Sequence, residues 1–106
     1  MIISRARPYT VFKRVTSKDN EGGTNTFYVE KEKAFRIEIW PASGRIQVMM
    51  YGERLRYMMN AITDYDNELY ESDGVAIETD DHPDYRVVSK SKYSNHIVYE
   101  LEKIIQ

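Results

Sequence analysis

The sequence predicts a mainly β protein, all-β in class: a small barrel or sandwich of about six to eight strands joined by long polar loops. Three observations lead to this prediction. Tyrosine is frequent, with nine in 106 residues, and aromatic and β-branched residues favour strands. Apolar and polar residues alternate in several short runs, as they do in strands with one buried face. Glycine, proline, asparagine and aspartate gather between those runs, where turns are expected.

The size and composition of the chain indicate one folded domain spanning residues 1–106. The sequence is 42% hydrophobic and 30% charged, which is typical of a globular protein and not of a disordered one. No apolar run approaches the roughly 18 residues of a membrane-spanning helix. The absence of cysteine excludes disulfides and cysteine-based zinc sites, and we expect a cytosolic product.

The first part of the chain predicts three strands and a loop. Residues 9–15 alternate in character and predict the first strand, and residues 26–32 predict the second. Between them, residues 17–25 are polar and include two adjacent glycines, which indicates a mobile loop or hairpin tip. Residues 34–40 alternate clearly and predict the third strand. Pro41 ends it, because proline cannot donate a hydrogen bond to a sheet.

The middle of the chain contains one further predicted strand and one segment with two interpretations. Residues 45–51 resume the alternation, with apolar side chains at every second position, and predict a strand. Residues 53–62 fit a strand by alternation, but they also carry apolar residues at helical spacing. Their leucine, methionine, arginine and alanine content favours a short helix. The residues alone leave both possibilities open.

The last third of the chain predicts short strands separated by turns. A Ser-Asp-Gly turn precedes a short strand at residues 75–78, and residues 79–84 form another turn. Residues 84–91 and 97–104 are two alternating runs around a short polar connection. Such a pair is typical of a β-hairpin, so this part of the chain supports the same fold class.

No motif indicates a catalytic or cofactor site. The glycines form neither a dinucleotide-binding nor a phosphate-binding pattern, and no serine stands in a nucleophile elbow. His82 lies among aspartates in residues 80–84, but a cluster of this kind within a turn is more typical of a solvated loop tip than of a metal site. We therefore expect no enzymatic activity and no cofactor.

A group of acids in the second half of the chain resembles a calcium-binding loop. Its members are Asp64, Asp66, Glu68 and Asp73. An EF-hand loop requires glycine at its sixth position and a carboxylate at its twelfth. Counted from Asp64, those positions hold Leu69 and Val75. The match fails, and we expect no metal.

Charge is distributed unevenly, although the net charge is only −2. Residues 1–56 hold 11 lysines and arginines against 6 acids, whereas residues 57–85 hold 9 acids and neither lysine nor arginine. Such segregation can give one molecule two oppositely charged faces, which suits head-to-tail contacts between copies in a ring. An acidic loop region that is simply solvated explains the pattern equally well.

Single-stranded nucleic-acid binding is an alternative function. Arg5, Arg7, Lys13 and Arg14 interleave with Tyr9 and Phe12. Small β-barrels bind single strands with such mixtures of bases and aromatics. The slightly negative net charge argues against this function, because nucleic-acid-binding domains are usually basic. Both aromatic residues would also suit a strand that packs its own core.

Two methionine pairs, Met49-Met50 and Met58-Met59, suggest an apolar surface near Trp40 and Tyr51. Adjacent residues on a strand point to opposite faces, so at least one member of each pair would face away from the core. Flexible methionines fill irregular cores and also coat adaptable binding surfaces. An interface patch and packing against a second layer both remain open.

Several pieces of the sequence occur together in a recognisable order. They are the strand leading into Trp40–Gly44, the stretch Tyr51–Arg54, the acidic segment that ends in Asp73-Gly74, and the closing runs at 84–88 and 96–101. In this order the chain resembles the head-closure (head–tail connector) proteins of tailed phages, especially the small version in PBSX-like defective prophages. The resemblance covers residues 35–104 and favours a strand at 53–62.

The resemblance implies a small β-barrel that forms a ring between the portal-side adaptor and the tail. Such a ring closes the DNA-filled head and docks the tail. The implied partners are copies of the chain itself, the portal-side adaptor protein and a tail terminator or tail-completion protein, with DNA in the channel as a further candidate. The implied location is the host cytoplasm during assembly and then the head–tail junction of the virion.

The polar loops are the expected contact sites, since such loops become ordered when they meet neighbouring subunits. They belong to the segments 18–25 and 64–73, which are polar and flanked by expected strands. The candidate partner-binding residues are Lys18, Asp19, Asn20, Glu21, Asp64, Asp66, Glu68 and Asp73.

Overall fold

The computed structural model describes residues 5–18, 20–79 and 81–104, and it confirms the predicted fold class. Of the residues described, 51% are in strands and 16% in helices, with six antiparallel strands closed into a barrel and one additional strand. The strands are β1 (Arg7–Lys18), β2 (Thr24–Glu30), β3 (Phe35–Pro41), β4 (Met58–Thr63), β5 (Gly74–Ala76), β6 (Tyr85–Lys92) and β7 (Ile97–Lys103). The helices are α1 (Arg45–Tyr51) and the 3-10 helices η1 (Gly52–Tyr57) and η2 (Tyr65–Asn67).

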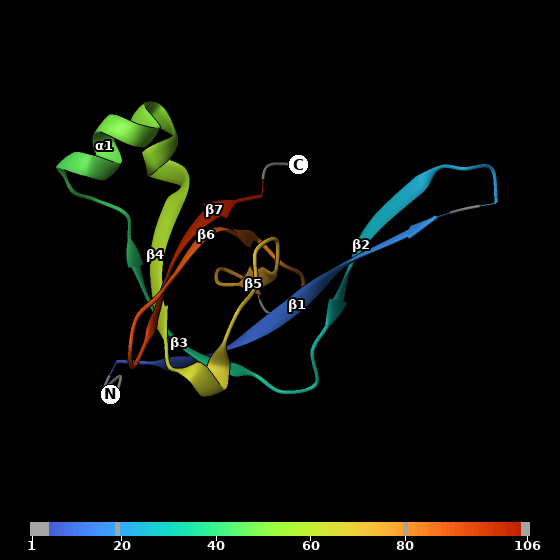
Figure 1. Cartoon of the computed structure of the whole chain (residues 1–106), viewed down its shortest axis with the longest axis horizontal. Coiled ribbons are helices and arrows are strands. Elements are labelled where there is room, and N and C mark those ends of the chain that lie inside the picture. Colours follow the sequence, from blue (N-terminus) through green and yellow to red (C-terminus); the bar gives the residue numbers. More distant parts are fainter. Residues whose placement is uncertain (1–4, 19, 80, 105–106) are drawn as a thin grey trace.

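Strand β1 takes part in both the barrel and a projection from it. The barrel strands follow the order β1-β3-β4-β7-β6-β5, and pairing of β5 with β1 closes the ring of strands. Within β1, residues 7–9 pair with β3 and residues 10–12 pair with β5. Residues 12–18 pair with β2 instead. This second half of β1, together with β2, forms a two-stranded arm that projects from the barrel (Figure 1).

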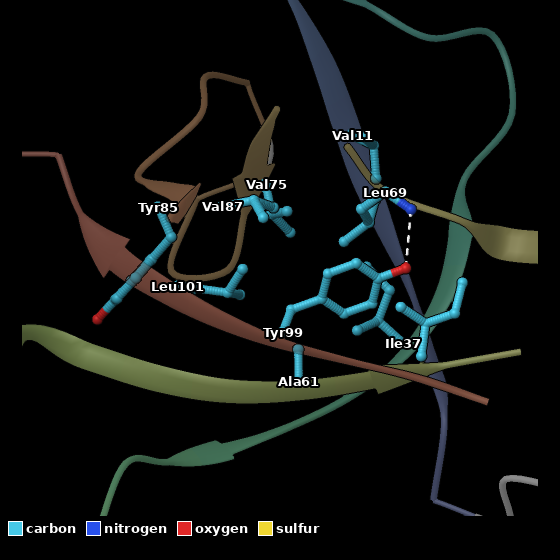
Figure 2. Packing of buried hydrophobic residues seen from close by; sticks show 10 residues of the cluster. Val11, Ile37, Ala61, Leu69, Val75, Tyr85, Val87, Tyr99 and Leu101 are labelled. Carbon is cyan, nitrogen blue, oxygen red and sulfur yellow. Dashed lines mark hydrogen bonds between the residues drawn. The ribbon is translucent and has the colours of Figure 1, made fainter. Parts of the chain in front are cut away.

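The core is filled by alternate side chains of the barrel strands (Figure 2). In β7 the inward residues are fully buried, at 0% exposure each: Ile97, Tyr99 and Leu101. The hydroxyl of Tyr99 accepts a hydrogen bond from the backbone N–H of Leu69 at 2.9 Å and shares another with the Thr63 hydroxyl at 2.9 Å. One buried tyrosine thereby fixes the loop around η2 against β4 and β7.

The arm, by contrast, buries almost nothing. Every described residue from 13 to 30 is exposed or partly exposed. Phe27 and Val29, on β2, are large apolar side chains that face solvent. Beyond Phe12, β1 pairs only with β2, and β2 pairs only with β1, within the described part of the chain. Two strand edges are therefore left without a neighbour.

The strand predicted at residues 45–51 is wrong, because this segment forms the helix α1. β3, which precedes the segment, pairs with β1 through residues 35–37 and with β4 through residues 38–41. A helix satisfies its backbone hydrogen bonds locally, and arginine, glutamine and methionine are good helix formers. Gly52, with φ of 55°, ends the helix in the left-handed region that glycine tolerates.

The ambiguous segment 53–62 contains both of the structures that its sequence suggested. The 3-10 helix η1 runs to Tyr57, and β4 begins at Met58. The two methionine pairs consequently separate: Met58 is buried in β4, whereas the other pair lies on α1. No helix in the described ranges is long and apolar enough to cross a membrane.

Candidate functional site

The most distinctive surface is a helical lobe, defined as α1 and η1 together, residues 45–57. It lies at one end of the barrel, beyond the ends of β3 and β4 (Figure 1). None of its residues is buried. The apolar side chains of α1 are strongly exposed, at 79% for Met49, 72% for Ile46, 65% for Met50 and 53% for Val48.

Polar side chains attach the lobe to the outer face of the barrel. Gln47 Nε2 donates to Asn60 Oδ1 at 2.7 Å and to Glu100 Oε2 at 2.8 Å. Tyr51 Oη donates to Glu100 Oε1 at 2.8 Å. Ser89 Oγ donates to the same carboxylate oxygen at 2.6 Å. A glutamate that alternates along β7 with the buried residues therefore holds the helix in place.

A second carboxylate, Glu102, holds η1. Arg54 places Nε and Nη2 each 2.8 Å from Glu102 Oε2. Arg86 Nη2 approaches the other carboxylate oxygen at 3.3 Å. Hydrogen bonds between charged groups are stronger than neutral ones, so this contact adds to the attachment made through α1.

The attachment determines which side of α1 faces water. Successive helical residues are rotated by about 100°, which puts Gln47 and Tyr51 on one side and Met49 on the opposite side. The polar side faces the barrel, and the apolar side faces solvent. This is the reverse of the usual arrangement, in which the apolar stripe of a surface helix packs on the core. This exposed apolar cluster makes α1 a candidate interaction surface.

The charge states of the attachment follow from its hydrogen bonds. Burial alone would raise the pKa of Glu100, but hydrogen bonds from Ser89, Gln47 and Tyr51 together lower it. The hydrogen bond to Glu100 in turn raises the pKa of the Tyr51 phenol, with burial adding to the effect. The carboxylate is therefore charged and the phenol protonated at neutral pH, as the hydrogen bond requires.

Three of the four predicted acids in segment 64–73, Asp64, Glu68 and Asp73, form hydrogen bonds or ion pairs within the protein. Asp64 caps η2, accepting hydrogen bonds from the backbone N–H of Asn67 at 3.1 Å and from its side-chain amide at 2.7 Å. Asp73 is buried, accepts from the backbone N–H of Tyr70 at 3.0 Å, and has its pKa raised by burial. Asp66 is exposed.

Glu68 lies in a small ion cluster. It pairs with Lys90 and, at 3.0 Å, with Lys92. Hydrogen bonds from Lys90 and then Lys92 lower the pKa of the Glu68 carboxyl. The exposed rings of Tyr65 and Tyr70 flank this cluster: Lys92 lies 6.0 Å from the Tyr65 centroid and Lys90 lies 4.2 Å from that of Tyr70.

The remaining predicted residues are at the tip of the arm. Lys18 ends β1, and Asn20 and Glu21 follow in the turn, all three exposed. Asp19 lies outside the described residues. The arm tip and the acidic segment are far apart in Figure 1, so the structure does not bring the two predicted groups together. A role for either group in partner binding stays a prediction.

The basic and aromatic residues near the N-terminus separate into three environments. Arg5, Arg7 and Tyr9 line a groove of about 330 Å³, together with Glu38, Ile39 and Trp40. Phe12 is buried at 5% exposure and belongs to the core. Arg14 is on the arm, 3.4 Å from the Ser72 hydroxyl. Only part of the predicted nucleic-acid-binding set therefore shares one surface.

The loop around His82 is held in shape by hydrogen bonds to the Asp84 carboxylate. Asp84 accepts hydrogen bonds from the backbone N–H groups of Ile77 at 2.7 Å and Glu78 at 2.6 Å. His82 contacts Asp81 at 2.7 Å on the surface. Within residues 5–18, 20–79 and 81–104, no three histidine, cysteine, aspartate or glutamate side chains are grouped as a metal site.

Comparison with known proteins assigns no family to the chain. No protein-family model matches the sequence, and no curated protein matches it significantly.

The helical lobe is the functional candidate that sequence reasoning missed. Two signals were present in the sequence: the Met49-Met50 pair, which suggested an apolar surface, and the good helix-forming residues of the segment. The alternation of apolar residues concealed the helix. The inverted orientation of α1 depends on Glu100, which is 53 residues from Gln47 along the chain, and no local pattern contains that information.

Proposed function

We propose that this chain is a structural subunit of a phage head–tail connector, forming part of a ring that closes the DNA-filled head and docks the tail. The observation that supports the proposal most is that the molecule combines a closed barrel with two projecting surfaces. A closed barrel supplies a rigid body, and two projections, the arm and the helical lobe, present exposed side chains. A subunit whose function is contact with neighbours needs no catalytic residue and no cofactor.

The proposed partners follow from the sequence resemblance. They are copies of the chain itself, the portal-side adaptor and a tail terminator or tail-completion protein. The ring would assemble in the host cytoplasm and remain at the head–tail junction of the virion. The unpaired edges of β1 and β2 support such contacts, since exposed strand edges readily accept a strand from another chain.

Electron microscopy of particles from a prophage lacking this gene tests the proposal. We expect separate, finished heads and tails, with many heads empty of DNA, because the junction would be missing. Re-expression of the wild-type gene is the control and should restore joined particles. Normally joined, DNA-filled particles from the deletion strain would contradict the connector function.

Single-stranded nucleic-acid binding is a second candidate, favoured by the groove that Arg5, Arg7, Tyr9 and Trp40 help to line. Bases can stack on such aromatic rings while arginines contact phosphates. We expect a salt-dependent affinity for single-stranded DNA that the double variant Arg5→Ala/Arg7→Ala loses and Arg14→Ala retains, as measured by fluorescence anisotropy. Equal binding by both variants, or none by the wild type, would remove this candidate.

A further inference from the structure

We propose that the base of the arm holds a binding site for a phosphate monoester. The site is the arm-base pocket, a pocket of about 360 Å³ where β1 leaves the barrel (Figure 1). The proposal goes beyond the connector function and does not depend on it. The pocket is lined by residues from β1, from the connection after β2 and from the loop before β5: Lys13, Arg14, Lys31, Tyr70, Glu71 and Asp73.

The pocket exists because β1 and the chain before β5 separate at Gly74. Strand β5 pairs with β1 only as far as Phe12, which lies opposite Gly74. Before Gly74 the backbone bonds to β6 instead: the N–H of Ser72 donates to the carbonyl of Val87 at 2.9 Å, and the N–H of Val87 donates to the carbonyl of Asp73 at 2.9 Å. Strand β1 continues past this loop into the arm, so the two residues that follow Phe12 line the pocket.

Two of the three cations in the pocket have no anionic partner. Lys13 and Arg14 form no ion pair with any residue in the described ranges. Arg14 Nη1 lies 3.4 Å from the Ser72 hydroxyl, which is a long contact. Lys31 Nζ lies 3.9 Å from Asp73 Oδ2, beyond hydrogen-bond distance. All three cationic groups can therefore donate hydrogen bonds to a ligand.

Aromatic rings position the lysines at the pocket. Lys31 Nζ lies 5.0 Å from the centroid of the Phe35 ring and 5.9 Å from that of Tyr70. Lys90 Nζ lies 4.2 Å from the Tyr70 centroid and is already paired with Glu68. The Lys90–Glu68 pair is neutral, so the charge available to a ligand comes from the residues that line the pocket.

Two acids reduce the positive charge of the pocket without cancelling it. Asp73 is buried, and its carboxylate accepts a hydrogen bond from the backbone N–H of Tyr70 at 3.0 Å. Burial raises the pKa of the Asp73 carboxyl, and the hydrogen bond and the nearby lysines oppose this effect only in part. Glu71 is exposed. With both acids ionised, the lining residues carry three positive charges against two negative ones, and protonation of Asp73 leaves an excess of two positive charges.

A phosphate monoester matches this pocket in charge and in hydrogen bonding. Its oxygens accept hydrogen bonds from lysine and arginine, the side chains that typically bind phosphate groups. A monoester carries a charge of about −1.5 to −2 at pH 7, whereas a phosphodiester carries a single negative charge. The excess of positive charge therefore favours the monoester. A bound dianion also favours the protonated form of Asp73, because like charges raise the pKa of a carboxyl.

Titration of isotope-labelled protein with glycerol phosphate, followed by NMR, tests the site. We expect saturable shifts of the amides of residues 12–14, 31 and 70–74, with a dissociation constant on the order of 1 mM, since a small ligand in a partly open pocket binds weakly. Dimethyl phosphate, a diester, should bind at least about tenfold more weakly, because it carries less charge. Equal affinities for the two compounds, or no shifts in these residues, would overturn the proposal. Tighter binding of inorganic phosphate than of glycerol phosphate would overturn the assignment to an ester.

Two double variants that remove equal charge provide a matched comparison. Lys13→Gln/Arg14→Gln removes two cations from the pocket and should weaken glycerol phosphate binding at least about tenfold. Arg5→Gln/Arg7→Gln removes two cations from the groove near Trp40 and should change the affinity by less than about twofold, because distant exposed charges are screened. A similar loss in both variants would indicate non-specific attraction and would overturn the site. The same comparison separates this pocket from the groove suggested for single-stranded DNA.

The variant Asp73→Asn supplies a readout of opposite sign. Asparagine keeps an acceptor for the N–H of Tyr70 but removes a negative charge beside the ligand, so the affinity should rise about threefold or more. Glu71→Gln, at an exposed position, should raise it by less and serves as the test if Asp73→Asn does not fold, which thermal unfolding verifies. Unchanged or lower affinity in both variants would contradict a phosphate in this pocket.

Discussion

Two seven-residue segments with the same alternation of apolar residues form different secondary structures, one a strand and the other a helix. They are β7, Ile97–Lys103, and α1, Arg45–Tyr51. The alternating apolar residues are Ile97, Tyr99 and Leu101 in β7 and Ile46, Val48 and Met50 in α1. The first three are completely buried, and the last three face solvent. The same local pattern thus produces the centre of the core in one segment and an exposed helix in the other.

The difference shows that alternation of apolar residues does not by itself decide between a strand and a helix. β7 lies between β4 and β6 and pairs with both. α1 follows β3, which pairs with β1 through residues 35–37 and with β4 through residues 38–41. The backbone of α1 forms local helical hydrogen bonds instead, and the side chains of Gln47 and Tyr51 fix the helix to β7 through Glu100.

The largest expected difference between the two segments is in stability. Leu101→Ala should lower the free energy of unfolding by about 2–5 kcal/mol, because it leaves a cavity in the core. Met49→Ala should change it by less than about 0.5 kcal/mol, because the side chain is exposed. Urea unfolding of both variants measures this difference. A similar loss of unfolding free energy in the two variants would contradict the exposed position of Met49 on α1.

Within β7, the hydroxyl of Tyr99 can be tested separately from its ring. Tyr99→Phe keeps the buried ring but leaves the backbone N–H of Leu69 without its acceptor, which should cost about 1–3 kcal/mol. Tyr93→Phe, on the exposed β6–β7 turn, is the matched control and should be close to neutral. Equal stability of Tyr99→Phe and the wild type in urea unfolding would show that the hydrogen bond is unimportant.

Acid should weaken the contacts made by Glu68 and Glu100. Their pKa values are lowered from 4.5 in the folded protein, so each contributes stability that is complete above that value and is lost as the pH falls through the folded pKa. The raised pKa of Asp73 acts in the opposite direction and offsets part of the loss. The melting temperature should therefore fall between about pH 5 and pH 3.

The double variant Glu68→Gln/Glu100→Gln provides the control for the acid effect. It should be less stable than the wild type at neutral pH and should show a flatter dependence of melting temperature on pH. If the melting temperature of the double variant fell as steeply with acid as that of the wild type, the effect would come from other carboxylates.

The attachment of the lobe should be separable from the stability of the barrel. Glu100→Gln weakens the charge-assisted hydrogen bonds from Gln47 and Tyr51, so amide hydrogen exchange in residues 45–57 should become faster. Exchange of the Tyr99 and Leu101 amides should change little. Glu38→Gln, on β3, is the matched control. Faster exchange throughout β7 in Glu100→Gln would contradict a separable lobe.

The sequence predicts the barrel better than its surface sites. The predicted strands at 34–40, 84–91 and 97–104 agree with β3, β6 and β7 within one residue at each end, because alternating β-branched and aromatic residues meet strand neighbours there. Closure of the barrel through β1 and β5 could not be predicted, since it depends on pairing between residues more than 60 positions apart.

The acidic segment shows why charged sites are difficult to predict from sequence. Its acids are close together in the chain and suggest a solvated or partner-binding surface. In the structure, Glu68 is paired with Lys90 and Lys92, and Asp73 is buried. Cations that are distant in sequence neutralise part of the segment, and only the folded chain reveals that Asp66 and Glu71 are exposed without an ionic partner among the described residues.

The most direct test of the account compares stability and self-association in one variant, Ile46→Ser/Met49→Ser. If the exposed side of α1 is an interaction surface, sedimentation velocity should show that association at high concentration is lost while the melting temperature stays within about 2 °C of the wild type. A clearly lower melting temperature with unchanged association would contradict the account, because it would make α1 part of the core of the fold.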